Sequence, residues 1–179
     1  IGGVSAGAFS ADGRLLAFVF GLTGLKGGKL AHWSDMLAVR REAQGRHLGS
    51  ALKQFQRASC RALGVETMYW TYDPLVARNA HLNLNLLGAS VDEFMPDMYG
   101  ANTNSHMHGS LGTDRFVVSW PVSTDPRPMP SDPALLAGVP VVGGGPGNAP
   151  QTDVPVASAV VVRIPGDFAA LLHADVERA

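Results

Sequence analysis

The sequence has little of several features that would identify a class of protein at once. It contains one cysteine, Cys60, so an internal disulfide and a cysteine-rich zinc cluster are both excluded. The net charge is −1 and the basic residues are spread along the chain, which gives no reason to expect nucleic acid or an anionic membrane as a partner. No apolar run approaches the roughly 20 residues that cross a bilayer, and no signal peptide is recognisable. We therefore expect a cytoplasmic protein that acts on a small molecule.

What is present predicts a domain that combines strands and helices. An apolar content of 46% over 179 residues is enough for one well-packed core. The turn at residues 10–13, with its Asp-Gly pair, lies between two apolar runs and predicts a β-hairpin. After a glycine-rich turn, "LAHWSDMLAV" predicts a third strand that ends at Val39.

Beyond Gly45 the apolar period changes from two to 3.6, which predicts a helix from about Arg46 to the glycine at position 64. The stripe expected on one face of this helix is Leu48, Ala51, Leu52, Phe55, Ala58, Ala62 and Leu63, and the stripe on the other is Lys53, Gln54, Arg57 and Arg61. The aromatic run "TMYWTY" then predicts a strand.

The next segment begins with Asp73 as the expected N-cap and Pro74 at the first helical position, and its helix is expected to close at Gly88. "VDEFMPDMY" and "DRFVVSWPV" predict two further strands. The order β-β-β-α-β-α-β-β indicates an α/β or α+β domain with a mixed sheet.

Three segments differ in composition. Residues 1–122 are the expected domain, and residues 123–153, with seven prolines and "GGGPG", predict a linker without a packed element. Residues 154–179 resemble a strand and the start of a helix, as at the beginning of a second domain. The chain opens without methionine and closes inside a helical pattern, which suggests a fragment of a longer protein.

The stretch "EAQGRHLGSALKQF" contains the residues that are expected to bind a ligand. A strand, a turn with glycines at 45 and 49, and a helix start together direct unpaired backbone N–H groups and the positive helix end at one point. Such a point binds anions, and Arg46 adds a charged donor for phosphate. The pattern is neither a Walker A loop nor Gly-x-Gly-x-x-Gly, and a pyrophosphate is the expected ligand.

The segment "LAVRREAQGRHLGSAL" resembles motif A of the GNAT superfamily, whose acetyl-CoA site reads Gln/Arg-x-x-Gly-x-Gly/Ala. Gln44, Leu48 and Gly49 match, and His47 stands at the family's first glycine. If that position needs positive φ, histidine costs about 1 kcal/mol. More narrowly, "WTYDPLVARNAHLN" and "LGTDRFVVSW" look like an uncharacterised branch of predicted acetyltransferases of this superfamily.

The resemblance covers residues 1–122 and implies a GNAT-like, mostly antiparallel mixed sheet with helices on both faces. The family's first strand and two helices, which precede the hairpin, have no counterpart in this chain. Leu87 and Gly88 match the first two residues of the family's Leu-Gly-Phe, and Ala89 replaces the phenylalanine. Leu84, however, stands where many members have the tyrosine that protonates the departing thiolate.

The resemblance also implies acetyl-CoA as the cosubstrate, with no metal, bound in a splay between the strands ending at Val39 and at Tyr72. Pantetheine would pair with the backbone of Leu37, Ala38 and Val39. The residues expected around the pyrophosphate are Gln44, Gly45, Arg46, His47, Leu48, Gly49 and Ser50. The acceptor amine would attack the thioester directly.

Catalytic candidates are Asp35 as base and Tyr72 or Tyr69 as replacement acid, with Tyr72 favoured because it is nearer the C-terminal end of its strand. An isolated aspartate in a strand more often has a structural role, and aromatic side chains in strands usually pack in the core. Each of these residues therefore has a structural alternative to the catalytic role. Asn79 and Asn83 share a helix face and either contact the cofactor or form a solvent stripe.

His106 and His108 have a spacing that metals use, but without a third ligand a polar loop is favoured.

Two functions remain: an acetyl-CoA-dependent N-acetyltransferase with a small amine or peptide acceptor, and a degenerate acyl-CoA-binding or interaction module without turnover. Exposed sheet edges also predict a homodimer.

Overall fold

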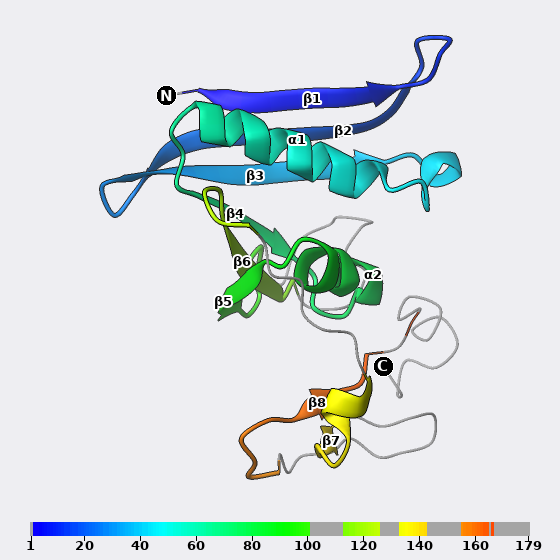
Figure 1. The fold of residues 1–179 in the computed structure, drawn as a ribbon, viewed down its shortest axis with the longest axis vertical. Helices are drawn as coiled ribbons and strands as arrows, with labels where there is room; N and C mark the ends of the chain where they lie inside the picture. The colour runs from blue at the N-terminus through cyan, green and yellow to red at the C-terminus, as the bar shows by residue number, and fades with distance from the viewer. Residues whose placement is uncertain (1, 101–112, 126–132, 143–154, 165, 167–179) are drawn as a thin grey trace.

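The computed structural model describes residues 2–100, 113–125, 133–142, 155–164 and 166, and its main body is one six-stranded sheet (Figure 1). The strands are β1 (Gly3–Phe9), β2 (Leu15–Lys26), β3 (Lys29–Val39), β4 (Thr67–Tyr72), β5 (Ser90–Met95) and β6 (Arg115–Pro121). Their spatial order is β1-β2-β3-β4-β6-β5. The predicted hairpin, the predicted order of elements and the mostly antiparallel sheet are confirmed.

The two halves of the sheet meet at its single parallel pair. β3 and β4 pair only over Ala31↔Thr67, His32↔Met68 and Trp33↔Tyr69. β3 then continues for six more residues and β4 for three, and neither continuation pairs with the other. The sheet is therefore splayed between the second half of β3 and the end of β4.

A bulge in β3 lies at the point where the strands part. The β2–β3 register passes from Leu22↔Trp33 to Phe20↔Met36, which inserts one extra residue into β3 opposite Gly21. A Cβ at position 21 would lie 2.3 Å from His32 Nε2 and 2.5 Å from the Trp33 carbonyl oxygen. Only glycine allows this close approach of the two strands.

Two helical segments cover the sheet. Helix α1 (Leu48–Ala62) lies over β1, β2 and β3, and α2 (Ala77–Ala80) continues into the π-helix η2 (His81–Leu86) beside β4, β5 and β6 (Figure 1). Both contact Trp70, whose ring meets the Lys53 amine of α1 and whose indole N–H donates to Asn83 of η2. Helices were expected on both faces, but these two lie on the same face of β4.

The buried core lies on the face of the sheet that the two helices cover, and it consists of two clusters. A small cluster joins Ala17 and Val19 of β2 to Leu52 of α1. The larger cluster lies under the second half of α1 and under η2 and contains Val4, Cys60, Val65, Met68, Trp70, Tyr72, Leu87, Ala89, Val118, Trp120 and Val122.

The predicted orientation of α1 is wrong. The buried residues are Leu52, Lys53, Gln56, Arg57 and Cys60, whereas Phe55 is 55% exposed and Leu63 is 52% exposed. The apolar period misidentified the face because three of the five buried side chains are polar and find partners on β3, on β4 and after β6. The helix ends as predicted, with Gly64 at φ 75°.

The second helix begins later than predicted. Asp73 does not cap it: its carboxylate accepts from the Leu75 N–H at 2.9 Å, and its carbonyl accepts from the Val76 N–H at 3.1 Å. These bonds close a local turn that competes with helix, so α2 starts only at Ala77.

The expected linker contains two short elements, the 3₁₀ turn η3 (Pro133–Leu136) and the strand β7 (Val141–Val142). β7 pairs in parallel with β8 (Val161–Val162), within the predicted strand of the last segment. His106, His108 and the predicted C-terminal helix lie outside the described residues. Among the helices that are described, none is both long and apolar enough to cross a membrane.

Candidate functional site

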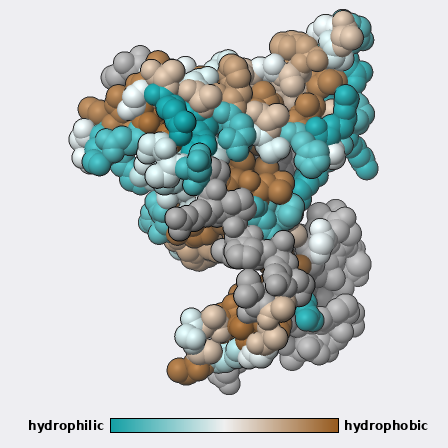
Figure 2. Space-filling view, in the orientation of Figure 1, coloured by the Kyte–Doolittle hydropathy of each residue, from teal (hydrophilic) through white to brown (hydrophobic). Residues whose placement is uncertain are grey.

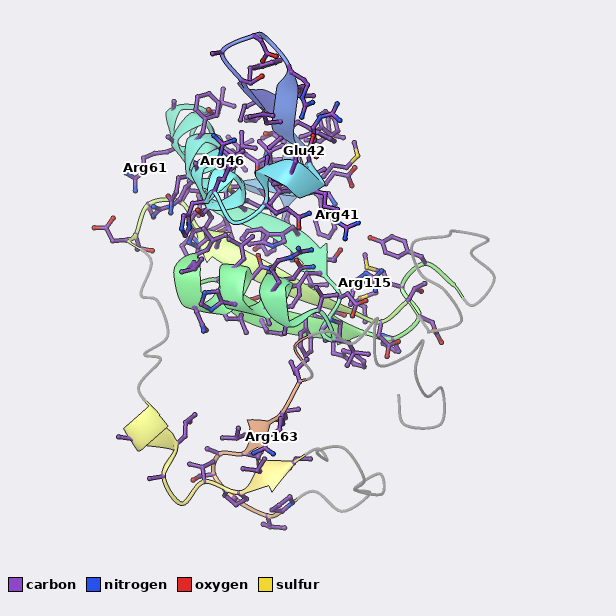
Figure 3. The ribbon with its side chains drawn as sticks, turned by 90° about the vertical axis from the view of Figure 1, so that its right-hand side faces the viewer. Arg41, Glu42, Arg46, Arg61, Arg115 and Arg163 are labelled. Carbon is purple, nitrogen blue, oxygen red and sulfur yellow. The ribbon has the colours of Figure 1, made fainter. Side chains whose placement is uncertain are left out.

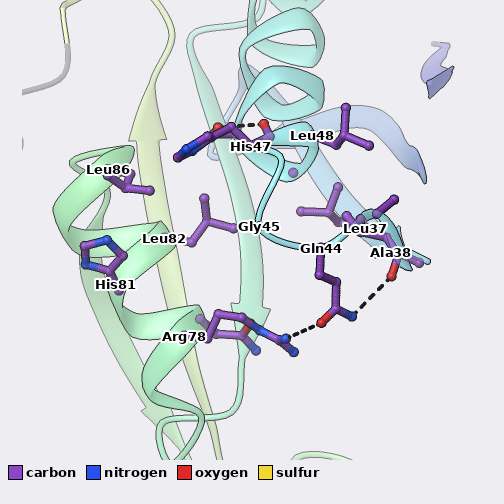
Figure 4. Close-up of a pocket in the computed structure, with 15 residues that line it drawn as sticks. Leu37, Ala38, Gln44, Gly45, His47, Leu48, Arg78, His81, Leu82 and Leu86 are labelled. Atoms are coloured by element: carbon purple, nitrogen blue, oxygen red, sulfur yellow. Dashed lines mark hydrogen bonds between the residues drawn. The ribbon is translucent and has the colours of Figure 1, made fainter. Parts of the chain in front are cut away.

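A cavity of about 400 Å³ opens between the end of β3, the start of α1 and the segment α2–η2 (Figure 4). Its apolar wall is formed by Leu37 and Leu48 on one side and Leu82 and Leu86 on the other. In Figure 2 an apolar patch lies between α1 and α2. The full lining is Leu37, Ala38, Val39, Ala43, Gln44, Gly45, His47, Leu48, Gly49, Ser50, Arg78, Asn79, His81, Leu82 and Leu86.

The turn from β3 into α1 is shaped by two left-handed residues. After the 3₁₀ turn η1 (Arg41–Ala43), Gly45 has φ 76° and His47 has φ 57°, and α1 begins at the next residue. No side chain caps the helix. The first N–H groups of a helix lack intrahelical carbonyl partners, so this turn presents backbone donors and the positive helix end to the cavity.

Gln44 and Arg78 connect the two walls. The Arg78 guanidinium donates to Gln44 Oε1 at 2.7 Å, and Gln44 Nε2 donates to the Val39 carbonyl oxygen at 3.4 Å (Figure 4). Gln44 thus joins the end of β3 to α2. Arg78 and His81 add positively charged and polar groups from the helical wall.

The surroundings of the turn are basic. Arg41 and Arg46 are exposed on the segment between β3 and α1 (Figure 3). The nearest acid in sequence, Glu42, forms an ion pair with Arg14. The local charge therefore favours an anionic ligand at the mouth of the cavity.

Ten of the twelve residues predicted to bind the cofactor line this cavity, and Arg46 and Asn83 do not. Asn83 is buried, and its side-chain oxygen accepts the Trp70 indole N–H at 3.0 Å. Sequence reasoning missed Ala43, Arg78, His81, Leu82 and Leu86. Arg78, Leu82 and Leu86 are spaced i, i+4, i+8, which places them on one face of a helix, and this spacing is the feature of the sequence that could have identified them.

The two predicted catalytic residues lie on opposite sides of the splay. Asp35 is exposed on β3, in the bulge just beyond the last pair with β4. Tyr72 ends β4, is 5% exposed and packs edge-to-face on Phe116, with ring centroids 5.8 Å apart. Burial raises the pKa of Tyr72, which keeps its hydroxyl protonated at neutral pH.

Within the described part of the chain, no three or more His, Cys, Asp or Glu residues gather as metal ligands would. The Cys60 thiol is buried, and burial raises its pKa to about 11, so it is a packed group and a poor nucleophile.

No protein-family model matches the chain, and no curated protein sequence matches it either. Solved structures do match. Naa20 of Chaetomium thermophilum, solved with a bisubstrate analogue, is 14% identical and aligns over 68% of this chain and 70% of its own, with a TM-score of 0.55. The ribosomal-protein-S18-alanine N-acetyltransferase of Escherichia coli is 17% identical over 72% and 74%, with a TM-score of 0.53.

A GNAT family acetyltransferase from Elizabethkingia anophelis with acetyl-CoA bound is 10% identical over 66% of this chain and 76% of its own, with a TM-score of 0.55. The match to the NatC complex covers 61% of that chain, with a TM-score of 0.51. The described sheet with its splay, and these matches, show that the chain has the fold of the GNAT superfamily.

Proposed function

We propose that this protein is an acetyltransferase that binds acetyl-CoA in the cavity beside β3 and transfers the acetyl group to an amine. The observation that carries the proposal is the position of the cavity. It joins the free edge of a splayed strand to the uncapped, basic start of a helix. GNAT neighbours solved with CoA or acetyl-CoA support the ligand class.

The shape of the site suits the parts of this ligand. Leu37, Ala38 and Val39 pair with β2 on one edge and leave the other edge, toward β4, unpaired. An amide-containing pantetheine arm would pair with this edge as an added strand does. The pyrophosphate would meet the first N–H groups of α1 together with Gln44 and Arg46.

Transfer requires no covalent enzyme intermediate. The acceptor nitrogen attacks the thioester carbonyl carbon, a C–N bond forms, and the C–S bond breaks with the electron pair leaving on sulfur. Asp35, directly or through water, takes the proton that the nitrogen loses, and Tyr72 donates a proton to the departing thiolate. Orientation in the cleft and a backbone N–H on the carbonyl oxygen supply the remaining acceleration.

Calorimetric titration with acetyl-CoA tests the proposal, with Gly49 as the probe. A Cβ at this position would meet Leu37, Val39 and Leu82 side chains at 3.8–3.9 Å, which is ordinary contact. Gly49→Ala therefore keeps the fold and most of the affinity, whereas the two methyl groups of Gly49→Val enter the cavity and weaken binding at least tenfold.

Full affinity in Gly49→Val would show that the ligand binds elsewhere.

Turnover is measured separately, as the rate at which the CoA thiol is released from acetyl-CoA in the presence of each of a panel of amines. Tyr72→Phe should lower kcat at least tenfold and leave the Kd for acetyl-CoA unchanged. Saturable binding without turnover for any acceptor would favour the alternative, a binding module that retains the left-handed His47 turn but has lost catalysis.

A further inference from the structure

A lysine lies buried at the point where the sheet splits. Lys53, on the face of α1 that covers the sheet, is 2% exposed, and none of the described carboxylates forms an ion pair with it. Burial lowers the pKa of Lys53 from 10.5 to about 7. A buried amine without a carboxylate destabilises a fold, and an apolar side chain of similar length would remove that cost.

The contacts of this amine are the two residues that would form the next β3–β4 pair. The last pair is Trp33↔Tyr69, so regular continuation would bring Ser34 opposite Trp70. Instead, Lys53 Nζ donates to Ser34 Oγ at 2.7 Å and lies 3.8 Å from the centre of the Trp70 ring. The amine thus contacts both strands at the first unpaired position.

A continuous series of hydrogen bonds holds the amine there. Ser34 Oγ donates to Gln56 Oε1 at 2.7 Å, and Gln56 Nε2 donates to His32 Nε2 at 3.0 Å. His32 therefore carries its proton on Nδ1 and donates to Thr23 Oγ1 at 2.9 Å. Burial, and then the charge of Lys53, lowers the pKa of His32 to about 4, which keeps this acceptor neutral.

We propose that Lys53 is a positioning residue of the acyl-CoA site: its amine holds β3 and β4 apart beyond Trp33↔Tyr69, so that the pantetheine arm can enter between them. The inference rests on the proposed function. It explains why a destabilising amine occupies the buried face of α1, although the periodicity placed Lys53 on the polar face. A positive charge at this point also favours a polyanionic ligand.

The test uses the full chain and three variants. Lys53→Met keeps the length of the side chain and removes the amine, and Ser34→Ala removes its acceptor on β3. Lys26→Met is the matched control because Lys26 Nζ also lies 3.8 Å from an aromatic ring, that of Tyr69, but is exposed. Thermal unfolding and the Kd for acetyl-CoA are measured for each.

Lys53→Met should unfold at the same or a higher temperature and yet bind acetyl-CoA at least tenfold more weakly, while Lys26→Met matches the wild type in both. If Lys53 had only a structural role, its replacement would not weaken binding while leaving the unfolding temperature unchanged or higher. The wild-type affinity should also fall as pH rises from 7 to 9, where Lys53 loses its proton, and Lys53→Met should show no such fall. The other titratable groups facing the amine are His32 and Cys60, with pKa values of about 4 and 11, so both keep their protonation state over this range.

Wild-type affinity in Lys53→Met would overturn the inference while leaving the proposed function intact. If that variant fails to fold, Ser34→Ala decides: several-fold weaker binding supports the role of the amine, and unchanged binding overturns it. Absence of saturable acetyl-CoA binding by the wild-type chain would overturn the proposed function, and this inference with it.

Discussion

At the scale of single residues, the buried polar series from Lys53 to Thr23 governs how stability depends on pH. Four hydrogen bonds join five side chains from α1 through β3 to β2, and none of the five is charged when both Lys53 and His32 are neutral. Satisfied networks of this kind hold neighbouring elements in one arrangement, and protonating a buried member destabilises the fold.

We predict that the free energy of unfolding rises with pH between 7 and 9. The pKa of Lys53 is 10.5 when unfolded and about 7 when folded, so across this window the unfolded chain keeps a proton that the folded chain releases. The gain is about 2 kcal/mol between pH 7 and 9. Above pH 9 the raised pKa of Cys60 opposes further gain.

Urea unfolding at pH 7, 8 and 9 measures the slope of the free energy of unfolding against pH. Lys53→Met should abolish this slope. Lys29→Met should retain it, because the pKa of Lys29 is raised by its hydrogen bond to Glu66 and Lys29 stays charged across the window. Equal slopes in wild type and Lys53→Met would mean that Lys53 does not titrate near pH 7.

At the scale of elements, the turn between β3 and α1 stores backbone strain where it presents its donors. His47 has φ 57° and ψ 14° without any side-chain cap, and its carbonyl accepts from the Ala51 N–H at 3.0 Å and from Ser50 Oγ at 2.9 Å. The position that the GNAT pattern assigns to glycine therefore has a left-handed backbone, which glycine adopts without steric cost.

His47→Gly should stabilise the protein by up to about 1 kcal/mol, because relief of the left-handed strain exceeds the added entropy of the unfolded chain. His81 offers the matched control: it lines the same cavity but has helical φ −59°. His81→Gly should destabilise by about 1 kcal/mol. Chemical denaturation compares the two, and a similar loss in both variants would contradict the strain at position 47.

At the scale of the whole molecule, residues up to Val122 contain both buried clusters of the described chain. The segment after β6 is tied to α1, because Arg61 donates to the carbonyl oxygens of Val122 and Ser123, at 3.0 and 3.2 Å, and Arg57 donates to that of Thr124. The β7–β8 pair forms a separate two-stranded sheet. The division into a domain, a linker and a second segment stays a prediction.

A chain that ends after Asp125 should therefore fold and bind acetyl-CoA with a Kd within threefold of the full chain, because the cavity and both clusters are retained. Circular dichroism, thermal unfolding and calorimetry check this. A chain that ends after Pro121 is the control: it lacks buried Val122 and the carbonyl acceptors of Arg57 and Arg61, and should be less stable. Loss of folding in the longer chain would show that the remaining residues complete the domain.

The outward face of the sheet carries exposed apolar side chains, among them Leu22 and Trp33, which pair across β2 and β3. β1 is an edge strand of the sheet. Pairing at this edge is the basis of the expected homodimer, which stays a prediction together with the cytoplasmic location and the acceptor.

The sequence alone determined the order of elements, the hairpin turn, the glycine end of α1 and the segment that turns from β3 into α1 beside the cavity. These features depend on local backbone preferences that glycine, aspartate and alternating apolar residues express within a few positions. The cavity lining contributed by residues 37–50 follows from the same local pattern, since a strand, a turn and a helix start are contiguous in the chain.

The tertiary structure alone decided which face of α1 is buried, where α2 begins and which helical residues complete the cavity. Lys53, Gln56 and Arg57 are buried because distant residues supply hydrogen-bond acceptors and aromatic rings that a polar side chain requires there. The splay likewise depends on a parallel pairing between segments some 36 positions apart, and on a bulge opposite Gly21. No local pattern specifies such contacts, because the free energy of burying a polar group depends on the partners that folding brings to it.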